Sequence, residues 1–196
     1  MSHHIYKTEG IILSSYNTGE ANKFFKIFTK DFGIIDAMAQ GVREVKSKLR
    51  YSLQDFSYLR VDLVRGKEIW RLTNAERIYI LDNIFSDEKK KKLVAQIYSL
   101  LRRLLAGQER NEELFNELIT SLKFLSNEEL SKKEMVYFEM MFVLRILHNL
   151  GYWEYKDEHE QFLKDGIWNR EILVSVEGQK SSILSSINKS IRESQL

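Results

Sequence analysis

The hydrophobic period of this sequence changes once, near Ile84 and Phe85, and this change restricts the folds the chain can adopt. Upstream, short runs rich in Ile, Phe, Tyr, Val and Thr are separated by glycine or polar turns, which is typical of β-strands. Downstream, apolar residues recur every three or four positions, which is typical of amphipathic helices. The order predicts an α+β chain, with a strand domain over residues 1–80 and a helical domain over residues 81–196.

The first part predicts five short strands. In the fourth, Leu59, Val61 and Leu63 alternate with polar neighbours, which is the period of a half-buried strand. Five short antiparallel strands need a closed or nearly closed sheet to cover their edges, and a five-stranded barrel of the OB type achieves this. The expected strands are 6–14, 22–29, 33–40, 57–65 and 68–75.

The second part predicts three helices and a less regular tail. The first helix begins near Ser86 and ends before Gly107, and the second begins near Asn111. A capping box at 131–134 opens a third helix, which is apolar nearly all round and ends at Gly151. In the tail, residues 153–160 are irregular, 164–166 look like a hairpin turn, and 180–193 form a weak polar helix.

Composition excludes several classes of protein. The chain has no cysteine, which rules out disulfides, thiolate zinc sites and a cysteine nucleophile. The net charge of +2 is too small for a globally basic surface, so any nucleic-acid binding must come from local clustering. Since the N-terminus lacks an apolar signal core, we expect a soluble cytoplasmic protein without a membrane span.

The stretch from Gly41 to Phe56 concentrates positive charge beside aromatic residues. Such a combination suits single-stranded nucleic acid, because cations displace counterions from the backbone while rings stack on bases. A solvated connecting loop is the alternative. The core of this stretch has a single acid, Glu44, and four cations, Arg43, Lys46, Lys48 and Arg50.

A second set of candidates lies on the predicted hairpin of strands 22–29 and 33–40. Lys23, Lys26 and Lys30 follow this hairpin and would complete a groove with the basic loop, although Lys26 could simply be solvated. Tyr51 and Tyr58 are the candidates for stacking on bases, whereas we expect Phe56 in the core.

Eight short pieces follow one another between residues 6 and 76. They are Tyr6–Leu13, Gly19-Glu20 ahead of Lys23, Ile27-Phe28-Thr29, Gly33, Ala39–Arg43, Ser47-Lys48-Leu49, Leu53–Phe56 and Leu72–Glu76. In their order and spacing, these pieces resemble the N-terminal domain of the RecO family of recombination mediators.

The resemblance implies an OB-fold domain followed by a helical domain in a bacterial, nucleoid-associated repair protein. Such proteins bind single- and double-stranded DNA, anneal complementary strands, and work with RecR and the single-stranded-DNA-binding protein SSB to load RecA in gap repair. Many members carry a four-cysteine zinc module after the Leu-Gly-Tyr that matches Leu150-Gly151-Tyr152 here. Because this chain has no cysteine, we expect no metal, and the form of residues 153–179 stays open.

The resemblance also implies that a pocket of the helical domain receives the acidic C-terminal tail of SSB. An arginine would hold the tail carboxylate by paired hydrogen bonds. The candidate cations are Arg102, Arg103, Lys123 and Arg145. For Arg145, an internal pair with Glu139 or Glu117 is the alternative.

No catalytic constellation stands out. Asp31-Phe32-Gly33 lacks the glycine-rich loop and catalytic loop of kinases, and His159 has no second histidine one turn away. We therefore expect a mediator without a cofactor rather than an enzyme. An adaptor that docks SSB or RecR with little annealing, and an OB-fold RNA-binding protein, are the alternatives.

Overall fold

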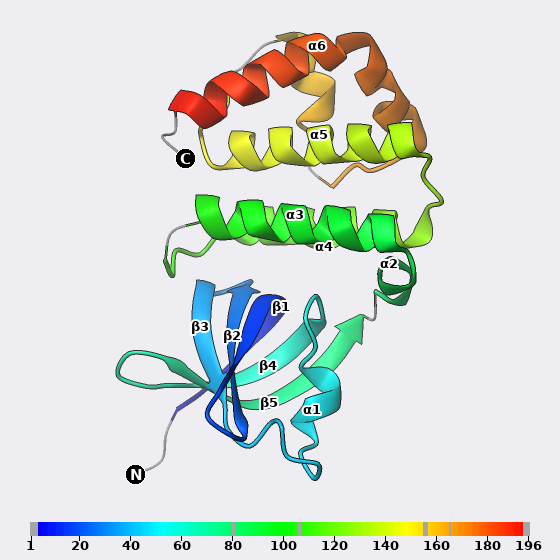
Figure 1. The fold of residues 1–196 in the computed structure, drawn as a ribbon. Helices are drawn as coiled ribbons and strands as arrows, with labels where there is room; N and C mark the ends of the chain where they lie inside the picture. The colour runs from blue at the N-terminus through cyan, green and yellow to red at the C-terminus, as the bar shows by residue number, and fades with distance from the viewer. Residues whose placement is uncertain (1–3, 80, 106, 155–156, 165, 194–196) are drawn as a thin grey trace. The chain divides into compact units, whose positions relative to one another are not determined.

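The computed structural model describes residues 4–79, 81–105, 107–154, 157–164 and 166–193, and Figure 1 shows its helices and strands. The chain forms two compact units, one of residues 1–81 with 98–115 and one of residues 82–97 with 116–196. The division into domains 1–80 and 81–196 stays a prediction.

Five strands close the barrel of the first unit in the order β1-β2-β3-β5-β4. Neighbouring strands are antiparallel except β3 and β5, which are parallel. This barrel followed by helices confirms the predicted fold class. The strands are β1 (Ile5–Thr18), β2 (Asn22–Thr29), β3 (Gly33–Ala39), β4 (Tyr58–Arg65) and β5 (Trp70–Tyr79).

Strand β1 is longer than the sequence predicts because it pairs with two neighbouring strands. Its first half pairs with β4 and its second half with β2, with a register shift between Ile12 and Ser14. The shift leaves Leu13 outside the β2 ladder, and the Leu13 carbonyl accepts a hydrogen bond of 2.9 Å from Arg102 Nη1. Such a bulge reverses which face the following residues occupy.

The barrel interior is apolar and closed at one end by the β3–β4 connection. Leu59, Val61 and Leu63 are fully buried in it, as the alternation of β4 predicts. Val42 and Leu53 come from the connection and join the same core, and between them lies the short helix α1 (Leu49–Ser52). The connection is therefore anchored to the barrel core by Val42 and Leu53, while the residues between them include exposed ones.

One outer face of the barrel is covered within the same unit by residues of 98–115. The ring of Phe115 lies 5.5 Å from Phe28 and 6.2 Å from Tyr58, measured between centroids. Phe56 packs against Tyr98 at 5.1 Å. These rings leave little of that face of β2 and β4 for a ligand.

The helices begin close to where the sequence predicts the first three of them. Ser131 Oγ accepts a hydrogen bond from Glu134 N, and the Glu134 carboxylate accepts one from Ser131 N, which confirms the capping box. These bonds lower the pKa of Glu134. The helices are α2 (Asp82–Ser86), α3 (Glu88–Leu104), α4 (Glu112–Asn127), α5 (Lys132–Asn149) and α6 (Arg170–Glu193), with a 3₁₀ helix, η1, at Asp157–Phe162.

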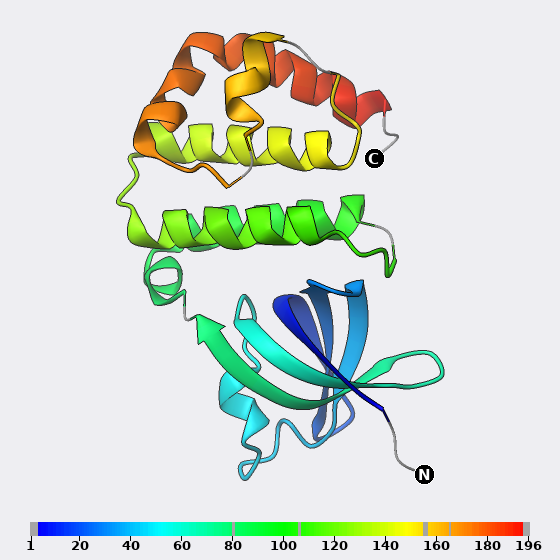
Figure 2. The same cartoon turned by 180° about the vertical axis from the view of Figure 1, so that it is seen from behind.

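The tail is more regular than the sequence predicts. Helix α6 begins ten residues before the expected position 180, because Asn169 Oδ1 accepts a hydrogen bond from Ile172 N and caps the helix. Of the expected hairpin turn, Asp165 lies outside the described residues. The segments on either side are η1 and α6 rather than strands, as both views show (Figures 1 and 2).

Replacing Phe115 with alanine should destabilise the barrel, because the ring is buried against Phe28 and Tyr58. We expect a loss of about 3–5 kcal/mol, the usual cost of Phe→Ala in a core, measured by amide hydrogen exchange of β2 and β4. The matched control is Val136→Ala on the exposed side of α5. Unchanged protection in the barrel strands would contradict the expectation and would favour residues 1–80 as an independent domain.

Candidate nucleic-acid interface

The β3–β4 connection holds its cations outward by burying the apolar residues between them. Val42 and Leu53 are 2% and 3% exposed, and Leu49 is partly buried against the same core. Successive backbone turns shape the segment, with hydrogen bonds of 3.1 Å from Glu44 N to Gly41 O and from Ser47 N to Glu44 O. The cations thus project from an ordered scaffold.

Arg43 anchors this connection to the turn between β1 and β2. Its Nη1 donates to Gly19 O at 3.1 Å, and its backbone N donates to Ala21 O at 2.9 Å. The start of β2 carries Lys23, whose Nζ lies 5.4 Å from the ring centroid of Phe25. The structure therefore brings Arg43 and Lys23 to the same end of the barrel.

Three further cations of the connection are uncompensated. Lys46, Lys48 and Arg50 are exposed, and none forms an ion pair with a residue that the structure describes. Beside them Tyr51 is 72% exposed. A local excess of positive charge next to an exposed ring is what the sequence leads us to expect of a nucleic-acid contact.

Lys26 and Lys30 have a different environment from these cations. Lys26 Nζ lies 2.8 Å from Asp36 of β3, and Lys30 Nζ lies 3.2 Å from Glu112. Lys30 and Arg110 hold the pKa of Glu112 below its usual range. Lys30 follows the end of β2 that is opposite to Lys23, so the structure separates it from the β3–β4 connection.

Tyr58 does not lie on an accessible surface. It is 7% exposed, its hydroxyl donates to Glu9 Oε2 at 2.5 Å, and burial raises its pKa. The ring is covered by Phe115. It therefore has no face open to a base, which corrects the expectation that Tyr58 stacks, whereas Tyr51 remains accessible.

An aromatic pair that the sequence does not predict as a site, an exposed tyrosine beside a half-buried phenylalanine, lies on β1 and β2. The rings of Tyr16 and Phe24 stack at 5.3 Å with an interplanar angle of 15°, and Tyr16 is 64% exposed. The strand pairing continues this row across the barrel, from Phe24 to Met38 and from Met38 to Arg71. The sequence ends the first strand at Ser14, so it gives no register that joins these residues.

The β4–β5 hairpin adds positive charge at the far end of this row. Arg65, Lys67 and Arg71 line a shallow hollow, together with Val64 and Gly66. The Arg65 guanidinium lies 5.6 Å from the ring centroid of Trp70. The hairpin projects from the barrel in both views (Figures 1 and 2).

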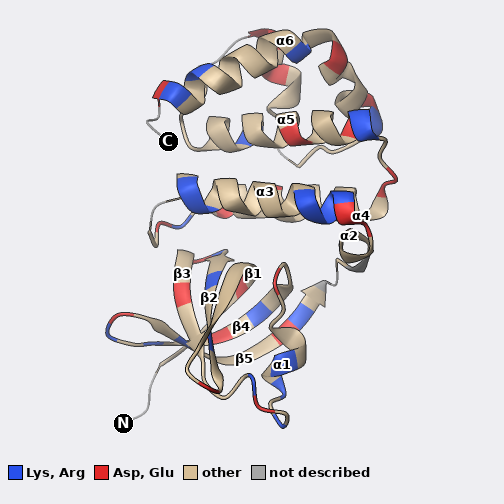
Figure 3. Ribbon diagram, viewed as in Figure 1, with Lys and Arg blue, Asp and Glu red and all other residues tan. Residues whose placement is uncertain are grey.

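The outer face of β4 is unsuited to phosphate, because its charges alternate in sign. Arg60 pairs in register with Glu9 of β1 and Glu76 of β5, and Asp62 pairs with Lys7. Acids directly beside cations offset their attraction for an anion. The alternation is visible along β4 and β5 in Figure 3.

The cations expected to hold the tail of SSB differ in their availability. In the first unit, Arg102 is half-buried and donates to Leu13 O, whereas Arg103 is exposed. In the second unit, Lys123 is exposed. Arg145 is buried and each of its three guanidinium nitrogens donates a hydrogen bond inside the unit, so the structure corrects the expectation for this residue.

Arg145 and Glu117 form a buried charge pair, one of the two internal pairs that the sequence leaves open. Nη1 lies 2.7 Å from Glu117 Oε1, and Nε and Nη2 donate to the carbonyls of Phe162 and Ile167. The Glu117 carboxylate also accepts hydrogen bonds from Gly166 N and Trp168 Nε1, both of 2.7 Å. The pair thereby fixes the segment that precedes α6.

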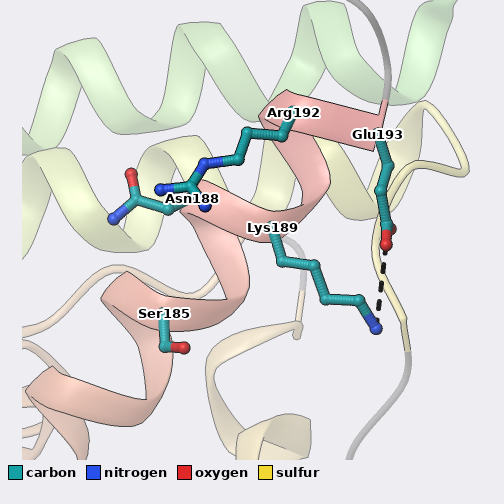
Figure 4. Close-up of a pocket in the computed structure, with 5 residues that line it drawn as sticks. All are labelled: Ser185, Asn188, Lys189, Arg192 and Glu193. Carbon is teal, nitrogen blue, oxygen red and sulfur yellow. Dashed lines mark ion pairs between the residues drawn. The ribbon is translucent and has the colours of Figure 1, made fainter.

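The described residues hold no cluster of three or more side chains suited to a metal ion, and none of their helices has the length and apolar content needed to span a membrane. A shallow hollow on α6 is lined by Ser185, Asn188, Lys189, Arg192 and Glu193 (Figure 4). Lys189 in it is paired with Glu154 and Glu193.

Comparison with known proteins identifies one family. The family model described as Recombination protein O N terminal matches residues 1–81. The DNA repair protein RecO of Alkaliphilus metalliredigens is 32% identical over 126 residues, which cover 64% of this chain and 51% of that protein. The DNA repair protein RecO of Dehalococcoides mccartyi is 31% identical over 149 residues, covering 76% and 57%. The chain thus spans about half the length of the curated relatives it matches.

The buried pair can be tested with Arg145→Met, which leaves the Glu117 carboxylate buried without its counter-charge. We expect the second unit to lose about 3–5 kcal/mol of stability, as when one partner of a buried ion pair is removed. Urea unfolding followed by far-UV circular dichroism measures this. The double variant Arg145→Met/Glu117→Leu should recover part of the loss, and the control Arg103→Met on an exposed side chain should have little effect. Equal stability of Arg145→Met and the unmodified chain would contradict the account.

Proposed function

Because this chain belongs to the RecO family through its N-terminal domain, we propose that it is a DNA repair protein that binds single- and double-stranded DNA and anneals complementary strands. Its relatives are named DNA repair protein RecO. Support from the chain itself comes from the cations of the β3–β4 connection. The proposal assigns DNA binding to the barrel and requires no cofactor and no catalysis.

The observation that carries the proposal is the uncompensated charge of Arg43, Lys46, Lys48 and Arg50 on an ordered segment. Each phosphate that such a cation neutralises releases a counterion, so binding weakens steeply as salt rises. The whole chain has a net charge of only +2, and on the barrel Arg60 and Lys26 have acids beside them, so this local excess would direct DNA toward the β3–β4 connection.

Annealing follows from the same electrostatics. Two complementary strands repel each other through their phosphates, and a protein that neutralises some of these charges lowers the repulsion while the bases pair. We propose that the exposed end of the barrel serves this purpose, with Tyr51 and Lys23 beside the connection.

We further propose that the protein acts with RecR and SSB to load RecA on SSB-coated DNA in recombinational gap repair. For the acidic tail of SSB, exposed Arg103 and exposed Lys123 are separate candidate contacts, each within its own unit. A guanidinium suits a terminal carboxylate because it donates two parallel hydrogen bonds.

The charge-reversal variant Arg43→Glu/Lys46→Glu/Lys48→Glu tests DNA binding. We expect it to abolish binding of a single-stranded oligodeoxynucleotide at physiological salt, because each lost phosphate contact removes about 0.7 from the slope of log affinity against log salt. Fluorescence anisotropy over a salt series measures both quantities, and a strand-annealing assay measures the activity. The matched control is Lys89→Glu/Lys92→Glu/Lys132→Glu, three exposed lysines of the other unit.

The outcomes separate the proposal from its competitors. Unchanged affinity of the charge-reversal variant would show that the connection is only solvated. Purified protein that neither anneals strands nor binds DNA with salt dependence, yet binds a peptide of the SSB tail, would favour an adaptor. A clear preference for RNA over DNA of equal length would favour an RNA-binding protein.

A further inference from the structure

Phe56, where the β3–β4 connection leads into β4, has a strained backbone. Its φ is +70°, and among the residues that the structure describes it is the one residue other than glycine with a positive φ. A bulky side chain rarely adopts this left-handed conformation, because its Cβ lies too close to the following carbonyl oxygen. Glycine would make the same turn at little cost, so the turn alone does not account for a phenylalanine here.

A second unfavourable feature lies directly against the Phe56 ring. Tyr98 packs on this ring at 5.1 Å between centroids and is fully buried. Its hydroxyl has no hydrogen-bond partner among the described residues, and burial raises its pKa. A buried hydroxyl without a partner loses the hydrogen bonds that it would make to water. The closed packing of these two rings therefore carries a cost on each side of the contact.

Hydrogen bonds to β1 hold residues 53–57, which we call the latch. Phe56 N donates to Ile12 O at 3.1 Å, and Asp55 Oδ1 accepts a hydrogen bond of 2.5 Å from Ser15 Oγ. Both contacts lie beside the bulge of β1. The latch thereby fixes the end of the connection that follows its cations.

Opening of the latch relieves both costs. When residues 53–57 leave β1, Phe56 returns to an extended backbone and water reaches the Tyr98 hydroxyl. Leu53 is then withdrawn from the barrel core, and relief of the two costs offsets part of that loss, so the open form is a minor state of the folded protein. The connection stays anchored mainly through Val42, at its other end.

We propose that this latch opens in the folded protein and lets the basic connection change its position when a second DNA strand joins the first. The connection contacts one strand in the closed form, and during annealing its cations must neutralise phosphates of two strands while the bases pair. An anchor that opens supplies this freedom without unfolding the barrel. The inference rests on the proposed annealing function and assigns a conformational step to the same site.

Tyr98→Phe tests the latch, because it keeps the ring and removes the hydroxyl. The amides of Phe56 and Ile12, which donate to Ile12 O and Ser57 O, report opening. We expect them to exchange with solvent about tenfold more slowly in this variant, because its closed form no longer buries an unpartnered group. Hydrogen exchange followed by NMR measures this, and amides of the β2–β3 ladder report global unfolding in the same sample. The control is Tyr137→Phe, a buried tyrosine of the second unit whose hydroxyl has hydrogen-bond partners, and it should leave these two amides unchanged.

A pair of variants at position 56 tests the backbone strain. Phe56→Gly and Phe56→Ala both remove the ring, but only glycine adopts a positive φ without steric cost. The Ile12 amide should therefore exchange about fivefold more slowly in Phe56→Gly than in Phe56→Ala. An unstrained position would give the opposite order, because glycine is the less favourable residue inside regular structure. Thermal melting checks that each variant is folded.

The annealing rate tests the role of the latch. Tyr98→Phe should anneal complementary strands about tenfold more slowly, in proportion to its smaller open fraction, while its affinity for a single-stranded oligodeoxynucleotide stays unchanged. Latch amides that exchange only at the rate of the β2–β3 ladder would overturn the inference, and so would normal annealing by a Tyr98→Phe variant with slowed exchange. Unmodified protein that neither anneals strands nor binds DNA would refute the proposed function and with it the annealing role, whereas hydrogen exchange would still decide whether the latch opens.

Discussion

The bulge at Leu13 is the constraint on which the first unit depends. Strand β1 pairs with β4 over Ile5–Ile11 and with β2 over Gly10–Thr18, and the β2 ladder shifts its register between Ile12 and Ser14, which bends the strand between its two neighbours. The bulge releases one backbone carbonyl from the ladder, and Arg102 satisfies it from within the same unit. A buried carbonyl without a partner would be costly, so the bulge and the arginine stabilise each other.

The same bulge determines which side chains face outward in the second half of β1. Before it, Ile12 points into the barrel core; after it, Tyr16 lies opposite Phe24 on the outer face. Without the reversal, Tyr16 would occupy an inward position near the end of the barrel. A backbone irregularity that closes the sheet therefore also creates the aromatic surface.

Charge compensation divides the barrel surface into faces that differ in how strongly they attract a polyanion. On β4, Arg60 has acids beside it in register, and Lys26 and Lys30 each have a carboxylate within 3.2 Å. Such exposed pairs contribute little stability, but they remove the local excess of charge that attracts a polyanion. Among the residues that the structure describes, the cations of the β3–β4 connection and of the β4–β5 hairpin form no ion pair, although Glu44 and Glu68 lie in these segments, and this difference rather than the total charge marks the candidate interface.

Local patterns predict much of the fold, and contacts that are distant in sequence account for what they miss. The alternation in β4 and the capping box at Ser131 depend on neighbours within a few residues, so the sequence identifies both. The burial of Tyr58 depends on Phe115, which is 57 positions away, and the separation of Lys30 from the basic connection depends on the strand pairing. Neither can be derived from spacing alone. The basic connection itself is identifiable because its cations lie within eight residues of one another, whereas the row of Tyr16, Phe24, Met38 and Arg71 exists only after four strands are placed in register.

In a chain without cysteine, the segment before α6 needs another means of being held, and the Arg145 and Glu117 pair supplies it. The guanidinium and the carboxylate each bond to the backbone of residues 162–167, so two side chains satisfy three backbone groups of an irregular segment as well as each other. Burying two charges is costly, and their attraction alone does not offset that cost unless the remaining donors and acceptors are also satisfied. Here the segment provides the missing partners, and Trp168 adds an indole donor and a ring 4.7 Å from the guanidinium. The pair and the segment are therefore interdependent: the segment is ordered by the charges, and the charges are tolerated inside the unit because the segment satisfies them.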